Sequence, residues 1–260
     1  MGRIVAVVNQ KGGVGKTTTA VNLAAALAAA EHRVLLVDID PQANASSGLG
    51  IGPQPLEQSV YAALLGGSPI VGLRRATELP TLDLVPSGPD LYGAEVELVA
   101  EADRFTRLRT ALAPVIGTYQ TILVDCPPSL GILTLNALCA ADSVLIPMQC
   151  EYYALEGLSQ LTRTVEMVRA GPNPALAVEG VLLTMFDARN NLARQVADDV
   201  RKNFGPQVFE AMIPRNVRLS EAPSFGKPIL LYDVASRGCQ SYFDLAREFL
   251  ARRPEGQAAA

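Results

Sequence analysis

The stretch QKGGVGKT occupies residues 10–17, after the apolar run RIVAVVN at 3–9 and before a helix-forming stretch at 17–30. Glycines in such a loop let backbone amides at the start of the helix surround an anion. In a loop that ends in Gly-Lys-Thr, the lysine reaches the outer phosphates of a nucleotide and the threonine hydroxyl coordinates Mg²⁺. We therefore predict a phosphate-binding loop, with Thr17 as a metal ligand, made of Gly12, Gly13, Val14, Gly15, Lys16, Thr17 and Thr18.

The loop departs from the common phosphate-loop spacing, which has a glycine five residues before the Gly-Lys pair. Gln10 stands at that position and Lys11 follows it, so the loop contains two lysines five residues apart. Lys16 already serves the phosphates that the loop holds. Lys11 is therefore either solvated or neutralises charge outside its own loop, and the residues themselves leave both interpretations open.

Short β-branched runs alternate with longer helical stretches along the chain. Strands are expected at 3–9, 33–40, 81–87, 119–125, 143–148, 178–186 and 208–214, and helices at 17–30, 56–65, 93–113, 130–141, 155–170, 189–204 and 237–252. Nearly continuous apolar runs are typical of parallel strands buried on both faces. The alternation predicts an α/β fold, with a doubly wound, mostly parallel sheet flanked by helices, as in phosphate-loop NTPases. No repeat or linker divides the chain, so we expect one domain over 1–253 and a frayed tail over 254–260.

Acidic residues end two further expected strands. Asp38 and Asp40 close RVLLVDID, and Asp125 closes YQTILVD. A single aspartate at a strand end is usually a cap or a turn former. Three of them at the edge where a parallel sheet binds its ligands, beside a phosphate loop, indicate nucleotide chemistry. Asp125 is the expected carboxylate that holds Mg²⁺ through a bound water, and Asp40 precedes a proline in a loop that could close over the terminal phosphate.

Composition narrows the class of protein. The 260 residues are 49% hydrophobic and 18% charged, as in a folded globular protein, and no apolar run reaches the ~18 residues that a membrane helix needs. The net charge of −4 argues against a dedicated nucleic-acid binder. Residues 1–188 carry 11 basic and 18 acidic side chains (net −7), whereas residues 189–260 carry 11 and 8 (net +3). This asymmetry indicates a partner surface in the last third or an ordinary solvated helix face.

Five segments together resemble a known family. KGGVGKTT, VDIDPQ, DCPPS, QCEYYALEGL and IPRNVRLSEAPSFGKPI are similar to those of the ParA/Soj chromosome- and plasmid-partition ATPases, in the deviant Walker A group that includes the MinD proteins. The resemblance spans about residues 2–250 and implies slow, Mg²⁺-dependent ATP hydrolysis by a cytoplasmic, nucleoid-associated protein. Because the sequence opens on the first expected strand, it resembles the short type without an N-terminal DNA-binding domain. Ala43 departs from the pattern, since the family usually has glycine after DPQ, and a positive φ there would strain the loop.

The resemblance gives the second lysine a role. In the family this lysine contacts the nucleotide of the other subunit, so that ATP is sandwiched in a two-fold dimer, and Gly12 would let the two backbones approach closely. It implies that Lys11, Lys16 and Asp40 are the catalytic residues. The lysines and Mg²⁺ would neutralise the transferred phosphoryl group while Asp40 orients the attacking water.

Further residues take their expected roles from the same resemblance. The adenine would lie against Pro214 and the Asn216 amide of the PRN segment. The ATP-bound homodimer would bind double-stranded DNA without sequence preference through Arg189 and Arg218. A ParB/Spo0J-type centromere-binding protein is the expected partner that stimulates hydrolysis, and no stable membrane association is expected.

Two alternatives stay open. A MinD-like membrane-associated switch needs a C-terminal amphipathic helix, and YFDLAREFLARR at 242–253 lacks a strongly apolar end. A metabolic enzyme of the same fold, such as a ligase, a reductase component or a metal-cluster carrier, is the other. A cluster carrier needs paired cysteines at a subunit interface, and the four cysteines form no C-x-x-C pair.

Overall fold

The computed structural model describes residues 2–151 and 154–252, so the expected tail at 254–260 lies outside the described residues. Seven strands form one sheet in the order β3-β4-β2-β5-β1-β6-β7. They are β1 (Arg3–Val7), β2 (Val34–Asp38), β3 (Arg75–Ala76), β4 (Leu82–Val85), β5 (Thr121–Asp125), β6 (Ser143–Gln149) and β7 (Ala177–Thr184). All neighbouring pairs are parallel except β3 and β4. The predicted fold class is confirmed.

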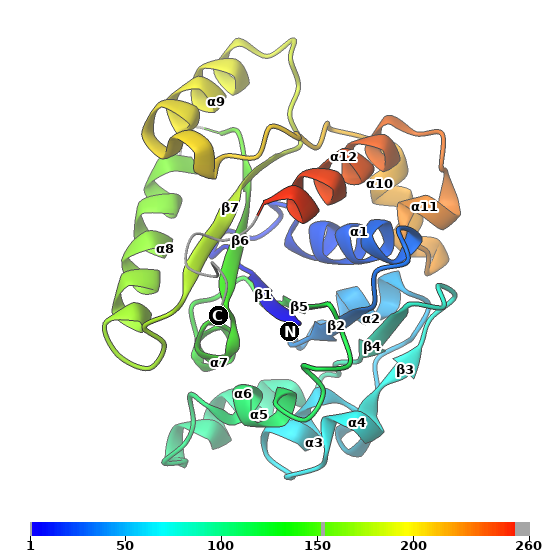
Figure 1. The fold of residues 1–260 in the computed structure, drawn as a ribbon, viewed down its shortest axis with the longest axis vertical. Coiled ribbons are helices and arrows are strands. Elements are labelled where there is room, and N and C mark those ends of the chain that lie inside the picture. The colour runs from blue at the N-terminus through cyan, green and yellow to red at the C-terminus, as the bar shows by residue number, and fades with distance from the viewer. Residues whose placement is uncertain (1, 152–153, 253–260) are drawn as a thin grey trace.

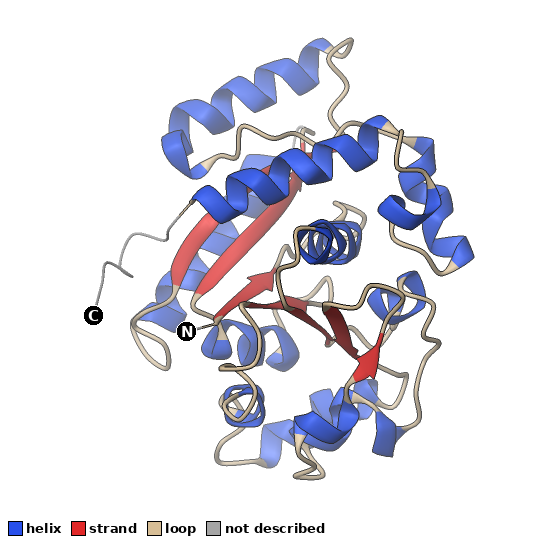
Figure 2. Ribbon diagram, turned by 45° about the vertical axis from the view of Figure 1, so that its right-hand side comes forward, coloured by secondary structure: helices blue, strands red, loops and turns tan. Residues whose placement is uncertain are grey.

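Helices cover both faces of the sheet (Figures 1 and 2). One face carries α3 (Val60–Leu64), α4 (Ile70–Leu73), α5 (Leu91–Glu97), α6 (Arg107–Leu112), α7 (Ile132–Ala140), α8 (Ala154–Arg169) and α9 (Asn191–Phe204). The other carries α1 (Lys16–Ala29), α2 (Asn44–Gly48), α10 (Val217–Glu221), α11 (Ile229–Tyr232) and α12 (Arg237–Ala251). Short 3₁₀ turns are η1 (Leu56–Gln58), η2 (Leu98–Ala100), η3 (Gly205–Gln207) and η4 (Ala222–Phe225). In the described part of the chain, no helix is both long and apolar enough to cross a membrane.

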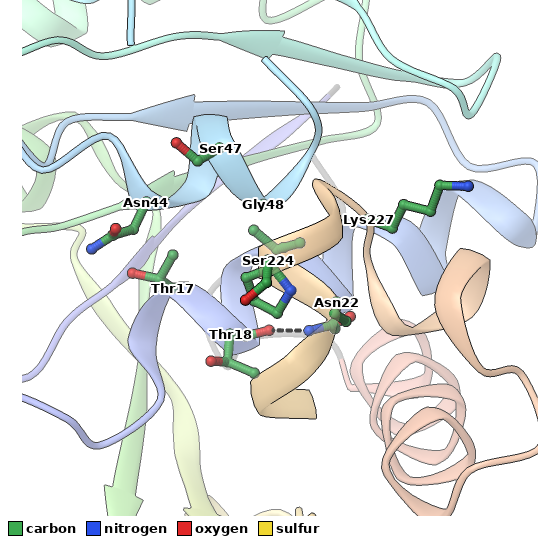
Figure 3. A pocket seen from close by; sticks show the side chains of 11 residues that line it. Thr17, Thr18, Asn22, Asn44, Ser47, Gly48, Ser224 and Lys227 are labelled. Carbon is green, nitrogen blue, oxygen red and sulfur yellow. Dashed lines mark hydrogen bonds between the residues drawn. The ribbon is translucent and has the colours of Figure 1, made fainter. Parts of the chain in front are cut away.

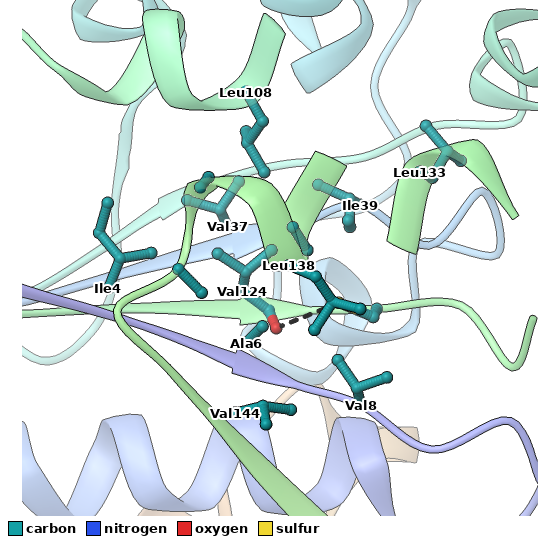
Figure 4. Close-up of a cluster of buried hydrophobic side chains, with 14 of the residues drawn as sticks. Ile4, Ala6, Val8, Val37, Ile39, Leu108, Val124, Leu133, Leu138 and Val144 are labelled. Carbon is teal, nitrogen blue, oxygen red and sulfur yellow. Dashed lines mark hydrogen bonds between the residues drawn. The ribbon is translucent and has the colours of Figure 1, made fainter. Parts of the chain in front are cut away.

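The central strand β1 explains why its sequence is apolar without alternation. Ile4 and Ala6 belong to the core on the α3–α9 side, whereas Val5 and Val7 belong to the core under α1 and α12. Figure 4 shows the first of these cores, in which side chains from β1, β2 and β5 meet α6 and α7. A strand buried on both faces needs apolar residues at every position.

The predicted strand at 208–214 is wrong. This segment runs beside β7 and makes isolated parallel bridges, Val181 with Val208 and Phe186 with Pro214. Between the bridges, the backbone amides of Glu210 and Ala211 donate to the Glu248 carboxylate of α12, both at 2.9 Å. The parallel hydrogen-bond ladder with β7 is therefore interrupted at this point. The hydrophobic periodicity of the sequence gives no sign that a distant side chain will bind the backbone here.

The predicted helix at 93–113 is interrupted. Between α5 and α6 the chain turns, with Glu101 in an extended conformation, and Arg107 pairs with Glu101 and Asp103 across the turn. The sequence patterns also missed the short elements β3, α2, α4, α10 and α11, which have two to five residues and are too short for a pattern to repeat. The predicted helix at 56–65 is also split, because Ser59 is extended (φ −111°, ψ 173°) between η1 and α3. The remaining predicted elements are present, with ends shifted by a few residues.

The sheet order positions the site. Strands β2, β5 and β1 are adjacent and parallel, so the loops that follow them leave the same edge side by side. Asp38 and Asp125 are direct partners across β2 and β5, and Val7 of β1 is the partner of Asp125 on the other side. Three loops that are far apart in the sequence are thereby brought together.

Candidate active site

The loop after β1 is shaped as the glycines require. Gly13 and Gly15 have φ of 74° and 84°, a left-handed conformation that other residues adopt at a cost. Helix α1 begins directly afterwards, with no side-chain cap and no acidic residue in its first turn. Its first amides, at the positive end of the helix dipole, are therefore available to an anion.

Two polar side chains hold this loop from outside. Asn9 donates from Nδ2 to Pro147 O (2.8 Å) and accepts from the amide of Lys11 (3.0 Å). Thr184, at the end of β7, donates from Oγ1 to Val14 O (2.8 Å). Neither residue was predicted from the sequence. The sign that could have identified them is a polar residue at the end of an otherwise apolar strand.

The two lysines lie in different environments. Lys16 is 6% exposed, and its Nζ donates to Lys11 O at 3.1 Å. Burial lowers the pKa of Lys16, although the nearby carboxylate of Asp125 opposes that shift. Lys11 is closer to solvent, and its Nζ lies 2.5 Å from Glu151 Oε2 of the same chain. Lys16 is thus buried in the loop, whereas Lys11 is held at its rim.

Two buried carboxylates face each other at the ends of β2 and β5. Asp125 is fully buried, and neither of its oxygens has a hydrogen-bond partner among the described residues. Burial, and then the charge of Asp38, raise the pKa of Asp125 well above its ordinary value. Such an arrangement is unfavourable by itself and is relieved by a cation. The unpartnered carboxylate of Asp125 fits a Mg²⁺ ion, and the assignment of Thr17 and Asp125 as its site stays a prediction.

Asp38, which the sequence analysis left without a role, organises the next loop. Its Oδ2 accepts from the amide and the hydroxyl of Ser46 (2.8 and 2.7 Å), and its Oδ1 accepts from the Asp40 amide (3.1 Å). Burial raises the pKa of Asp38 to about 6. The Ser46 hydroxyl in turn accepts from the amide of Ser87, beyond β4. Asp38 thus anchors both ends of the segment that carries Asp40.

Asp40 and Ala43 lie in that segment. Asp40 is 5% exposed, and its Oδ1 accepts from the Gln42 amide at 2.9 Å. Ala43 is buried with φ 53° and ψ 34°, so the position does require a left-handed conformation. The methyl group makes this conformation costly by ~1–2 kcal/mol. The loop therefore keeps its shape at the expense of backbone strain next to Asp40.

Two adjoining cavities lie beside the phosphate loop, and the linings of both leave out Lys11, Lys16, Asp40 and Asp125. One, of about 420 Å³, is lined by Gly15, Thr18, Pro214 and Asn216 among others. The second, of about 410 Å³, lies between the start of α1, helix α2 and η4, and shares Thr18 with the first. Figure 3 shows Thr17 near Asn44 of α2, and Thr18 next to Asn22 on α1. The structure thus brings the expected adenine residues and the phosphate loop to one cleft.

Asn216 has a structural task in addition. Its Oδ1 accepts from the amides of Arg218 and Leu219 and so caps α10. The carboxamide oxygen is therefore occupied, and the NH₂ group is the part of Asn216 that remains to recognise a base.

The two arginines expected to bind DNA are exposed but paired with acids. Arg189 donates from Nε and Nη2 to both oxygens of Asp187, at 3.0 and 2.9 Å, and lowers the pKa of Asp187 to about 2. Arg218 pairs with Glu221 at 2.9 Å and with Asp233 at 3.4 Å. A phosphate would have to compete with these carboxylates.

Comparison with known proteins decides the family. A family model described as an AAA domain matches residues 2–178. The chromosome partitioning protein ParA of Myxococcus xanthus is 63% identical over 252 residues, covering 97% of this chain and 89% of that protein. The chain belongs to the ParA/Soj family. A second relative, the sporulation initiation inhibitor protein Soj of Bacillus subtilis, is 58% identical over 251 residues, covering 96% and 99%.

Solved structures share the ParA/Soj fold. A cobyrinic acid a,c-diamide synthase from Mycobacterium smegmatis, bound to an ATP analogue and magnesium, has a TM-score of 0.84 and 38% identity, over 96% of this chain and 95% of that one. The cell division ATPase MinD of Pyrococcus furiosus has a TM-score of 0.79 and 26% identity, over 96% and 99%. This ParA/Soj-family chain is accordingly a P-loop ATPase, and the cofactors of the family's reaction are ATP and Mg²⁺.

Proposed function

We propose that the protein is an ATP-dependent DNA-segregation ATPase that acts in the cytoplasm on the nucleoid. ATP would join two copies into a sandwich dimer, the dimer would bind DNA without sequence preference, and hydrolysis would release it. Residues 1–253 would work as one ATPase domain. The relatives named ParA and Soj support the partition role.

The observation that carries the proposal is the difference between the two lysines of one loop. Lys16 is buried where it can serve its own phosphates, whereas Lys11 lies at the rim with its side chain 40% exposed. An ATP γ-phosphate at a subunit interface needs a counter-charge, and a two-fold dimer supplies one lysine to each site reciprocally. Gly12 supports this geometry, because a Cβ built on it meets nothing within 4 Å in the single chain.

Hydrolysis would depend on positioning and charge neutralisation. Lys16, Lys11 and Mg²⁺ would stabilise the charge that develops on the γ-phosphoryl group. Asp40, held by the Gln42 amide, would orient the attacking water. A carboxylate that only orients the water is a weak catalyst, which suits slow turnover that a ParB/Spo0J-type partner accelerates.

DNA binding would come from the basic last third of the chain, through Arg189 and Arg218. A monomer that touches ~3 phosphates becomes a dimer that touches ~6, and the salt slope then approaches about −5. ATP-driven dimerisation therefore raises the affinity for DNA from that of a weakly binding monomer. The acids paired with each arginine keep the affinity of a single chain low.

The alternatives are less well supported. For a MinD-like membrane switch, α12 would have to present an apolar face, yet Phe249 and Leu245 of α12 are buried in the core under α1. For a cluster carrier, cysteines would have to reach a subunit interface, yet all four cysteines are buried. The metabolic-enzyme alternative is represented by the cobyrinic acid a,c-diamide synthase, which is 38% identical to this chain. The chromosome partitioning protein of Myxococcus xanthus is 63% identical.

The decisive experiment measures DNA binding with ATP, with ADP and without nucleotide. A gel shift on two unrelated duplexes should appear with ATP and be absent in the other two states. Equal binding in all three states would contradict the proposal. Binding to liposomes instead of DNA would favour the membrane switch.

A further inference from the structure

Helix α5 and the turn η2 that follows it expose a row of large apolar side chains. Tyr92, Val96 and Val99 are 53%, 76% and 61% exposed. Their spacing of four and three residues places them on one side of the helix, which we call the α5 stripe. The opposite side, with Leu91 and Leu98, is buried in the core. Figure 1 shows α5 beside α6 and α3, at the end of the molecule remote from α12.

Negative charge borders this stripe. Residues 90–103 contain five carboxylates and no lysine or arginine, namely Asp90, Glu95, Glu97, Glu101 and Asp103. Arg107 neutralises the last two of these carboxylates. Among the described residues, the first three make no ion pair within the chain. The surface is therefore an apolar row with uncompensated negative charge beside it.

The same helix touches both loops that carry the site's carboxylates. Tyr92 Oη accepts from Gln42 Nε2 at 3.1 Å, two residues after Asp40. Glu95 lies against the loop that follows Asp125, since a Cβ built on Gly131 would be 3.0 Å from Glu95 Oε1. A partner bound to α5 would therefore be linked to the Asp40 loop through Tyr92 and to the loop after Asp125 through Glu95.

We propose that the α5 stripe is a docking surface for a basic amphipathic segment of a partner protein, and that docking changes ATP hydrolysis through Gln42 and the 126–131 loop. Apolar residues of the segment cover Tyr92, Val96 and Val99, and its lysines or arginines face the free carboxylates. A purely apolar partner would leave those carboxylates desolvated and unpaired, which is costly. The effect on hydrolysis rests on the proposed ATPase cycle, whereas the docking does not.

A model peptide tests the docking. The probe is a labelled 18-residue helix of leucine and lysine with one apolar face, titrated into the full chain without nucleotide or DNA. We compare the wild type with Val96→Ser/Val99→Ser, which removes apolar surface, and with Asp90→Asn/Glu95→Gln, which removes charge. The control is Glu166→Gln/Met167→Ser on α8, where one exposed carboxylate and one exposed methionine are removed elsewhere.

Val96→Ser/Val99→Ser and Asp90→Asn/Glu95→Gln should each bind the peptide at least about tenfold more weakly than the wild type does. The α8 control should bind it with the affinity of the wild type. Failure of the wild type to bind, or equal affinity of all variants, would overturn the proposal. Loss of ATP-driven dimerisation in Val96→Ser/Val99→Ser without peptide would also overturn it, because the stripe would then be covered by a second copy. The substituted positions are exposed, so each variant should fold like the wild type, and circular dichroism checks this.

Tyr92→Phe separates docking from its consequence. Phenylalanine keeps the apolar ring and removes the hydroxyl that accepts from Gln42. This variant should bind the peptide like the wild type, yet the peptide should no longer change kcat. An unchanged response of kcat would show that Gln42 does not transmit docking. Since peptide binding is measured without nucleotide, a failure of the DNA-segregation function leaves the docking result interpretable.

Discussion

The Lys11 ammonium lies 2.5 Å from Glu151 Oε2 of its own chain, 140 residues further along the sequence. A lysine expected to reach the nucleotide of a second subunit is thus engaged within the monomer. Both side chains are 40–45% exposed, so the ion pair is worth at most ~1 kcal/mol. In the proposed dimer this ion pair would compete with the contact from Lys11 to the second nucleotide without preventing it.

Each dimer would break two such ion pairs, so Glu151→Gln should lower the protein concentration at which ATP forms the dimer by up to about 30-fold. Sedimentation velocity in ATP and Mg²⁺ measures this shift. Glu166→Gln, an exposed carboxylate on α8, is the matched control and should leave the dimer unchanged. A Glu151→Gln protein that dimerises like the wild type would mean that the ion pair does not affect dimerisation.

Gly12→Val should act in the opposite direction and block the dimer, which the same sedimentation experiment measures. The monomer should stay folded, because the added Cβ enters open space.

Lys16→Ala should weaken ATP binding by about two orders of magnitude, since it removes a charge-assisted bond to the phosphates. Titration calorimetry measures the affinity. Folding should not suffer, because the buried ammonium is desolvated in the free protein. ATP affinity near that of the wild type would contradict the assignment of the phosphate loop.

Asp40→Ala should bind ATP and dimerise but hydrolyse ATP about 100-fold more slowly, because the residue acts on water rather than on binding. A single-turnover assay on preformed dimer gives the rate. The dimer should persist correspondingly longer in the sedimentation experiment. Normal turnover would transfer the water-orienting role to another residue.

Asp125→Asn should stabilise the nucleotide-free protein while abolishing Mg²⁺-dependent hydrolysis. Removing one of two adjacent buried carboxylates relieves ~1–2 kcal/mol, or roughly 2–6 °C in the melting temperature of a chain of this size. Scanning calorimetry without metal tests this, with exposed Asp198→Asn as a control expected to change nothing. A lower melting temperature for Asp125→Asn would mean that the buried carboxylate stabilises the nucleotide-free fold.

Arg189→Ala and Arg218→Ala should each weaken ATP-dependent DNA binding on any sequence and lower the salt slope by about one to two per dimer. Asp187→Asn should do the reverse, because it releases the Arg189 guanidinium from its bidentate partner. Gel shifts across a salt series measure both effects, and sedimentation confirms that dimerisation is intact. If none of the three substitutions changed the affinity for DNA, this surface would be excluded as the DNA-binding site.

Local patterns predicted much of this architecture because they depend on near neighbours. The glycines of 12–15, the apolar run before them and the helix after them specify a phosphate loop within twenty residues. The same reasoning failed at 208–214, where Glu248 takes the Ala211 amide, which lies between the two amides that donate to β7. It also left Ala43 undecided, since a left-handed conformation is visible in φ and not in the residue type.

The sequence by itself determined the fold class, the family and the chemical types at the site, because periodicity and motif spacing are properties of short stretches. The tertiary structure decided which of those residues meet. Asp38 becomes the partner of Asp125 through the order of β2 and β5, Thr184 reaches the phosphate loop from β7, and Glu151 meets Lys11. Each of these contacts joins residues separated by more than 80 positions. At that separation the side-chain pairing is set by how helices and strands pack, since chain connectivity no longer constrains it.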